Sequence, residues 1–273
     1  MTEAVPTSAL PRVPGVETLA PEGERTRPSA DASLVFDNIS KAFPDGTIAL
    51  VNVTFDVRPG EFVTVVGPSG CGKSTLLRIA SGLTPSSSGV VRVNRDSLGY
   101  VFQDPTLLQW RTVRRNIELL AELHGVGKTE RGRLAQEAID LVGLTGFEDK
   151  YPKQLSGGMR MRASLARSLT LSPNVFLFDE PFGALDEITR ERLNDELLTL
   201  FSSKGFASLF ITHSIYEAVF LSTRVIVMSG RPGRIVGDFE VPFGYPRSHD
   251  LRFEAQFAEL TGEVSHALRG AHS

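Results

Sequence analysis

One short segment restricts what this chain of 273 residues can fold into. Residues 67–74 read Gly-Pro-Ser-Gly-Cys-Gly-Lys-Ser, which matches the pattern G-x-x-x-x-G-K-S/T. An apolar run rich in β-branched residues, 61–66, precedes this segment, and a helical pattern, Lys73–Ala80, follows it. A strand, a glycine-rich turn and a helix in this order direct successive backbone N–H groups and the positive end of a helix dipole towards one point. The segment is therefore predicted to cradle phosphate groups.

The residues of this phosphate loop have separate expected roles. Lys73 is expected to reach the β- and γ-phosphates of a nucleotide, and the Ser74 hydroxyl is expected to ligate Mg²⁺. The residues predicted to bind the nucleotide here are Gly67, Pro68, Ser69, Gly70, Cys71, Gly72, Lys73, Ser74 and Thr75. Cys71 is the one cysteine of the chain, which excludes an internal disulfide. Because Cys71 lies inside the phosphate loop, a thiol-modifying reagent is expected to block nucleotide binding.

Strand and helix patterns alternate along most of the remaining chain. Strands are predicted at 34–39, 50–57, 61–66, 90–93, 98–102, 175–178, 208–211, Arg224–Met228 and 235–239, and helices at Lys73–Ala80, 112–123, 130–142, Gly157–Leu169, 186–201, Ile215–Leu221 and 253–268. This alternation predicts an α/β fold around a largely parallel sheet. The helical block at about residues 105–170 interrupts it, so an inserted helical subdomain is expected.

The composition of the chain changes near residue 32. The first 31 residues hold five of the 16 prolines and no aromatic residue, so they offer too little apolar surface to offset chain entropy. A disordered tail is therefore predicted over residues 1–32, and one nucleotide-binding domain over 33–273. The net charge of −3 argues against a general nucleic-acid binder, which needs a basic surface. No apolar run approaches the roughly 18 residues that span a bilayer.

An acidic pair follows a second apolar run further along the chain. Residues 175–180 read Val-Phe-Leu-Phe-Asp-Glu, so a buried strand would deliver Asp179 to the edge of a sheet. Asp179 is expected to hold Mg²⁺ directly or through water, and Glu180 to orient or deprotonate an attacking water. The pair is a weak signal on its own. Together with the phosphate loop it favours an enzyme that hydrolyses nucleoside triphosphates.

Five further motifs make the sequence similar to the ATP-binding cassette (ABC) family. In family order these motifs are Phe43, Gln103, Leu-Ser-Gly-Gly-Met at 155–159, Gly-Ala-Leu-Asp at 183–186, and His213. They resemble the adenine-stacking aromatic, the Q-loop, the signature loop, the D-loop and the switch histidine of that family. The resemblance covers about residues 33–240 and implies a P-loop NTPase cassette. Its expected parts are a RecA-like core, an N-terminal antiparallel β-subdomain, the inserted helical subdomain and a C-terminal helix.

The same resemblance implies a role for each motif in binding and hydrolysing ATP. Phe43 would stack on the adenine, and Gln103 would join Ser74 and Asp179 at Mg²⁺. The groups expected to act in hydrolysis are Lys73, Gln103, Glu180 and His213. The residue type of Phe43, taken alone, is equally compatible with an aromatic side chain of the core.

The signature and D-loop segments are expected to bind a nucleotide as well. The residues involved are Ser156, Gly157, Gly158 and Asp186. In the family, the signature loop of one subunit closes over the γ-phosphate held by the other, which implies a head-to-tail homodimer around two ATP molecules. The alternative for residues 156–158, taken alone, is an ordinary helix N-cap.

Three features are similar to one branch of the family, the importers of nitrate, sulfonate and taurine. These features are Met159 at the end of the signature loop, Leu-Leu-Gln-Trp at 107–110, and residues 228–235. They imply an ATPase subunit bound peripherally to the cytoplasmic face of a membrane, with permease subunits as partners, an extracytoplasmic solute-binding protein as an indirect partner, and no nucleic acid. Leu107, Leu108 and Trp110 would line a groove for a helix of the permease. A soluble ABC ATPase outside transport and an exporter subunit are the alternatives.

Overall fold

The computed structural model describes residue 29 and residues 31–271, so most of the tail predicted over residues 1–32 lies outside the described residues. The strands are β1 (Leu34–Ala42), β2 (Ile48–Val57), β3 (Phe62–Val66), β4 (Ser88–Val93), β5 (Leu98–Val101), β6 (Val175–Asp179), β7 (Ala207–Ile211), β8 (Arg224–Met228) and β9 (Ile235–Glu240). The α-helices are α1 (Lys73–Ala80), α2 (Val113–Ile117), α3 (Leu119–Leu123), α4 (Lys128–Leu141), α5 (Gly157–Leu169), α6 (Glu187–Lys204), α7 (Ile215–Leu221) and α8 (Ala255–Gly270). The predicted α/β class is confirmed.

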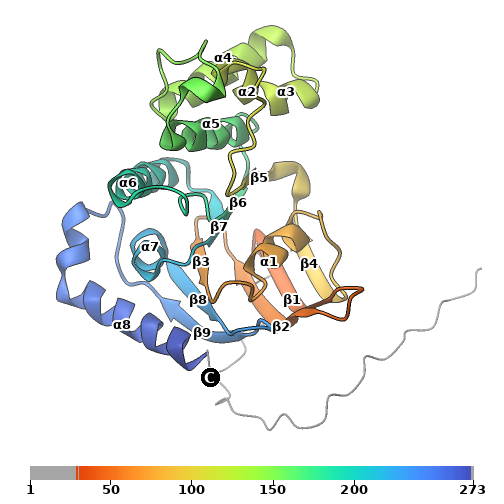
Figure 1. The fold of residues 1–273 in the computed structure, drawn as a ribbon, viewed down its shortest axis with the longest axis vertical. Coiled ribbons are helices and arrows are strands. Elements are labelled where there is room, and N and C mark those ends of the chain that lie inside the picture. The colour runs from red at the N-terminus through yellow and green to blue at the C-terminus, as the bar shows by residue number, and fades with distance from the viewer. Residues whose placement is uncertain (1–28, 30, 272–273) are drawn as a thin grey trace, which may run out of the picture.

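The strands form two separate sheets (Figure 1). Three strands make an antiparallel sheet in the order β2-β1-β4, and six make a larger sheet in the order β5-β6-β7-β3-β8-β9. Neighbours in the larger sheet run parallel except at one edge, where β9 pairs antiparallel with β8. The carboxyl ends of β3, β5, β6 and β7 therefore meet at one end of the sheet, which is where parallel α/β sheets bind their ligands.

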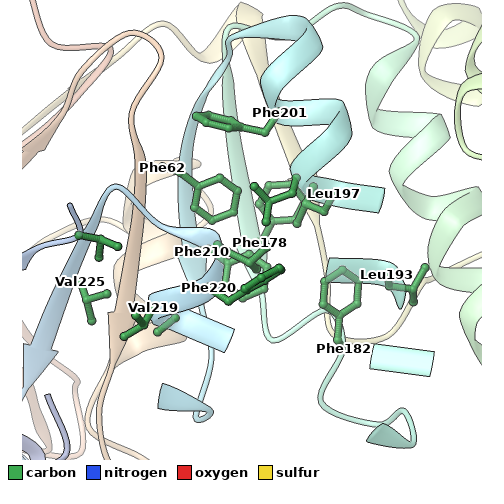
Figure 2. Close-up of a cluster of buried hydrophobic side chains, with 14 of the residues drawn as sticks. Phe62, Phe178, Phe182, Leu193, Leu197, Phe201, Phe210, Val219, Phe220 and Val225 are labelled. Carbon is green, nitrogen blue, oxygen red and sulfur yellow. The ribbon is translucent and has the colours of Figure 1, made fainter. Parts of the chain in front are cut away.

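Both faces of the larger sheet are covered, because successive side chains of a strand point to opposite faces. Phe62 and Phe178 belong to a buried cluster on the side of α6, α7 and α8. Val63, which follows Phe62, and Leu177, which precedes Phe178, belong to a second cluster with α1, β1 and β2 on the other face. Figure 2 shows part of the first cluster, in which Phe62 lies beside Phe201 of α6. Burial on both faces explains why the central strands read as continuous apolar runs.

Helices α2 to α5 pack around a core of their own, and α5 joins this group to the large sheet at β5 (Figure 1). That core includes Val113, Ile117, Ala135, Ile139 and Ala163. The single helix predicted at 112–123 is divided into α2 and α3, which meet at Glu118. The backbone of Glu118 keeps near-helical angles of φ −60° and ψ −18°, so the division is a small irregularity in one helical path.

The last helix begins at Ala255 and not at residue 253, where the sequence placed it. Glu254 is extended, with φ −78° and ψ 144°, and Phe253 ends a 3₁₀ turn that spans His249–Phe253. The side chain of Phe253 is 79% exposed. The buried face of α8 is formed by Phe257, Thr261 and Val264, so the apolar character of Phe253 was a misleading start signal.

Replacement of Phe62 by alanine should lower the free energy of unfolding by about 3–5 kcal/mol, because this ring is fully buried between two strands and α6. Equilibrium unfolding in denaturant measures the change. Phe253→Ala is the matched control, with an expected effect within about 0.5 kcal/mol, since that ring is exposed. Equal effects of the two substitutions would contradict the position of Phe62 in the core.

Candidate nucleotide-binding site

The phosphate loop joins β3 to α1 and lies in close contact with β2. Gly70 and Gly72 have positive φ angles of 76° and 105°, a region that residues with a Cβ avoid. A Cβ on Gly72 would also lie 2.7 Å from the Leu50 side chain and 2.9 Å from the carbonyl oxygen of Ala49. No side chain in the described part of the chain caps the start of α1. The first N–H groups of this helix are therefore left for an anion.

Lys73 places a buried cation inside the loop. Its Nζ donates hydrogen bonds to the carbonyl oxygens of Gly67 (2.8 Å) and Pro68 (3.0 Å). The same atom lies 4.0 Å from Oε1 of Glu180. The ammonium group is thus fixed between the loop backbone and a carboxylate, within the space that the loop encloses.

Ser74 and Asp179 bring a hydroxyl and a carboxylate together beside the loop. Ser74 Oγ donates to Asp179 Oδ1 at 2.8 Å, and the phenol of Tyr100 donates to Asp179 Oδ2 at 3.3 Å. Burial raises the pKa of Asp179, against the hydrogen bonds from Ser74 and Tyr100, which lower it. Burial and the neighbouring Asp179 also raise the pKa of Tyr100, so the phenol keeps its proton and remains a donor. The oxygens of Ser74 and Asp179 are the kind of ligand that Mg²⁺ prefers.

Glu180 connects the lysine to the histidine. Its Oε2 lies 3.3 Å from Nδ1 of His213, on the opposite side from the Lys73 contact. The backbone of Glu180 has a φ of 44°, which is unfavourable for a residue with a side chain and occurs repeatedly at functional sites. Its N–H donates to the carbonyl oxygen of Ile211 at the end of β7. Three segments that are distant in sequence therefore meet at this carboxylate.

Two predicted site residues lie near this centre without a side-chain hydrogen bond to it. Gln103 follows β5, and because Val101 of β5 pairs with Phe178 of β6, its loop leaves the sheet beside Asp179. The Gln103 side chain is exposed. Phe43 lies in the turn between β1 and β2 and is 37% exposed, with Lys41 Nζ 5.2 Å from the ring centroid. Phe43 is thus outside the buried core, which disfavours the core alternative.

The second expected phosphate-binding segment is separate from the first. Ser156 begins α5, in the group of helices α2 to α5, and its Oγ accepts the Met159 N–H at 3.3 Å. Asp186 begins α6, and its carboxylate accepts the Thr189 N–H at 2.9 Å, which lowers the pKa of Asp186. A Cβ on Gly158 would lie 3.0 Å from the Thr189 side chain, so these two helix starts adjoin each other. In the described residues, no hydrogen bond or ion pair links either start to the phosphate loop.

Known proteins share this arrangement. A family model described as ABC transporter matches residues 50–183. A putative ATP-binding protein of Brucella abortus is 42% identical over 240 residues, which cover 85% of this chain and 92% of the relative. The chain belongs to the ABC transporter family. As a member of that family it is an ATP-binding subunit and an ATPase.

Two further relatives of this ABC ATPase carry the names of import proteins. The nitrate import ATP-binding protein of Synechocystis is 42% identical over 238 residues, which cover 82% of this chain and 89% of the relative. The aliphatic sulfonates import ATP-binding protein of Bacillus cereus is 42% identical over 238 residues, which cover 84% and 92%. Both match nearly their whole length, so the similarity extends beyond the nucleotide motifs.

The solved structure of a bacterial ABC transporter cassette has the same fold. That cassette is dimeric and matches with a TM-score of 0.68 and 30% identity, over 77% of this chain and 100% of its own. It has also been solved in a post-hydrolysis state bound to ADP and Pi. The expected cassette fold is therefore confirmed for this ABC ATPase.

Sequence reasoning missed two side chains at this ABC site. Tyr100 contacts Asp179, as described above, and Arg231 donates from Nε and Nη2 to the carbonyl oxygen of Gly70 at 3.2 and 3.1 Å. Arg231 lies 161 residues from Gly70 and outside the segment that the family model matches. Arg231 belongs to the importer-like pattern at residues 228–235, but nothing in that pattern indicates a contact with the phosphate loop.

Cys71 lies in the phosphate loop of this ABC ATPase, with its side chain turned into the core. Its side chain is buried in the core cluster under the loop, and burial raises the pKa of the thiol. The expected block of nucleotide binding by thiol reagents therefore requires the loop to open first.

An aromatic disulfide reagent should label Cys71 at least about tenfold more slowly in the native protein than in the unfolded chain, since the thiol is both buried and protonated. Added ATP should slow the native reaction further, because a bound nucleotide stabilises the closed loop. Absorbance of the released thiolate follows the reaction. Labelling of the native protein at the unfolded rate would contradict the burial of this side chain.

Proposed function

We propose that the chain is the ATP-hydrolysing subunit of an importer that carries nitrate, a sulfonate, taurine or a similar small solute. The observation that supports hydrolysis most directly is the contact of Glu180 with both Lys73 and His213 at the phosphate loop. Import and the solute class are supported by the relatives named as nitrate and aliphatic sulfonate import proteins.

The oxygen atoms beside the phosphate loop fit Mg²⁺ as ligands. The Ser74 hydroxyl and the Asp179 carboxylate are adjacent oxygens, and Mg²⁺ is commonly held by one or two protein oxygens together with phosphates. Gln103 would complete this set when its exposed side chain turns towards Asp179. Bound there, Mg²⁺ neutralises charge on the β- and γ-phosphates. Phe43, half-exposed in the neighbouring turn, would stack on the adenine.

Hydrolysis in this proposal is a matter of positioning and charge. Lys73 and the free N–H groups of α1 hold the phosphates. Glu180 accepts a proton from the attacking water, and His213 directs a hydrogen bond towards the γ-phosphate. The contact between His213 Nδ1 and Glu180 Oε2 orients both side chains before ATP arrives.

Two copies of the chain are needed for one complete site in this proposal. Ser156, Gly157, Gly158 and Asp186 lie at the starts of α5 and α6, and among the described residues no hydrogen bond or ion pair links them to the phosphate loop of their own chain. A head-to-tail dimer would bring them to the γ-phosphate bound by the partner. ATP binds the closed dimer better than the open one and so shifts the population towards it.

The remaining part of the proposal concerns the membrane. In the described residues, no helix has the length and apolar character needed to cross a bilayer. We assign the chain to the cytoplasmic face, where it would bind permease subunits and, through them, an extracytoplasmic solute-binding protein. Trp110 is 74% exposed and is available for a permease helix, whereas Leu107 is buried in the core of α2 to α5 and does not line a groove.

Glu180→Gln should lower kcat for ATP by about 10²–10⁴-fold, because the amide cannot accept the proton from water, while ATP binding is retained. Phosphate release measures turnover, and size-exclusion chromatography with ATP should show a trapped dimer. Glu259→Gln on exposed α8 is the control and should behave as wild type. Full ATPase activity in Glu180→Gln would remove Glu180 from the role of base.

A further inference from the structure

A closed hydrogen-bonded loop surrounds the switch histidine. The Thr212 hydroxyl donates to Oε2 of Glu217 and accepts the Ser214 N–H at 3.0 Å. The Ser214 hydroxyl accepts the Glu217 N–H at 3.3 Å, so Thr212 and Ser214 are both bound to Glu217. His213 lies between them and reaches out to Glu180. The conformation of the loop that presents His213 therefore depends on Glu217.

Glu217 is buried in a way that the function described so far does not explain. Its side chain is 6% exposed, and its second carboxylate oxygen, Oε1, has no hydrogen-bond partner among the described residues. The neighbouring Asn194 on α6 is also buried, and its Oδ1 lacks a partner too. Among the described residues, the buried carboxyl is therefore held by one side-chain hydrogen bond, from Thr212.

The carboxyl of Glu217 faces two charged or titratable groups, Arg190 on α6 and His213 in the loop. Burial raises the pKa of Glu217, and this effect exceeds the opposing ones from the Thr212 hydrogen bond and from the charges of Arg190 and His213. The carboxyl thus contacts the loop of His213 on one side and faces α6 on the other.

The same side chain also adjoins the D-loop. Arg190, which faces Glu217 from α6, donates to the carbonyl oxygen of Leu185 at 3.0 Å. Leu185 in turn lies against the signature loop, since a Cβ on Gly157 would be 3.1 Å from its side chain. Glu217 thus lies between the loop that holds His213 and the segments expected to meet the partner subunit.

We propose that Glu217 is a positioning residue for hydrolysis, which holds His213 towards Glu180 through its hydrogen bond with Thr212. This inference rests on the proposed roles of Glu180 and His213. It assigns to Glu217 no contact with ATP, because the phosphate loop and Phe43 bind the nucleotide elsewhere. Loss of Glu217 should therefore change kcat and leave KM for ATP unaltered.

The test compares Glu217→Gln, Glu217→Ala and Glu217→Met. The glutamine amide keeps an acceptor for Thr212, so kcat should stay within about threefold of wild type. Alanine and methionine lack that acceptor, and a small displacement of His213 should lower kcat by about tenfold to a hundredfold with KM unchanged. Methionine fills the volume, so it serves if the alanine variant does not fold. Glu259→Ala, on the exposed side of α8, is the matched control.

The comparison of kcat with KM separates this role from mere support of the fold. A purely structural defect would leave the kcat of the folded protein unchanged, whereas loss of the Thr212 contact should lower the kcat of folded protein and glutamine should restore it. Thermal melting of each variant confirms that the assayed protein is folded.

Two results would overturn the inference. They are a kcat of folded Glu217→Ala or Glu217→Met equal to wild type, and a loss in Glu217→Gln as large as in those variants. Glu180→Gln, assayed in parallel, tests the proposed function separately. If that variant is inactive while wild type hydrolyses ATP, a negative result at Glu217 counts against this inference alone.

Discussion

The site depends above all on the contact between the phosphate loop and the end of β6. Ser74 Oγ lies 2.8 Å from Asp179 Oδ1, and Lys73 Nζ lies 4.0 Å from Glu180 Oε1, although 105 residues separate Ser74 from Asp179. Strand β7 lies between β3 and β6 in the sheet and aligns their carboxyl ends. A cation, a hydroxyl and two carboxylates are thereby held around one space before any ligand is bound. The buried cores on the two faces of that sheet supply the stability that holds these polar groups together.

A second consequence of the fold is the separation of two anion-binding surfaces. The phosphate loop lies at the start of α1, next to the large sheet, whereas Ser156 caps α5 within the group of helices α2 to α5. The start of α5 is anchored to the start of α6, because Gly157 and Gly158 lie against Leu185 and Thr189. These two starts would therefore move together relative to the phosphate loop. This arrangement gives a physical reason for a site shared between two copies.

The sequence predicted the features that depend on local pattern. The phosphate loop, the apolar strands and the acidic pair after β6 each carry their signal within about ten residues, so the α/β class and the ATPase identity were predicted correctly. Contacts across the fold carried no such signal. Tyr100 reaches Asp179 only because β5 pairs with β6, and Arg231 reaches Gly70 from 161 residues away. The sequence carries no local signal for the burial of Glu217, because that burial depends on α6. The roles of Phe43, Gln103 and the signature loop stay predictions.

The central claim is that the phosphate loop of one chain works with the signature loop of another. Mixing two inactive variants tests it most directly: Lys73→Ala, which lacks the phosphate-binding cation, and Ser156→Arg, which obstructs the signature loop. A mixed head-to-tail dimer contains one intact composite site, so equal amounts should recover about a quarter of the wild-type ATPase rate after the subunits exchange. A mixture no more active than the two variants measured separately would show that each chain completes its own site, and would contradict the account.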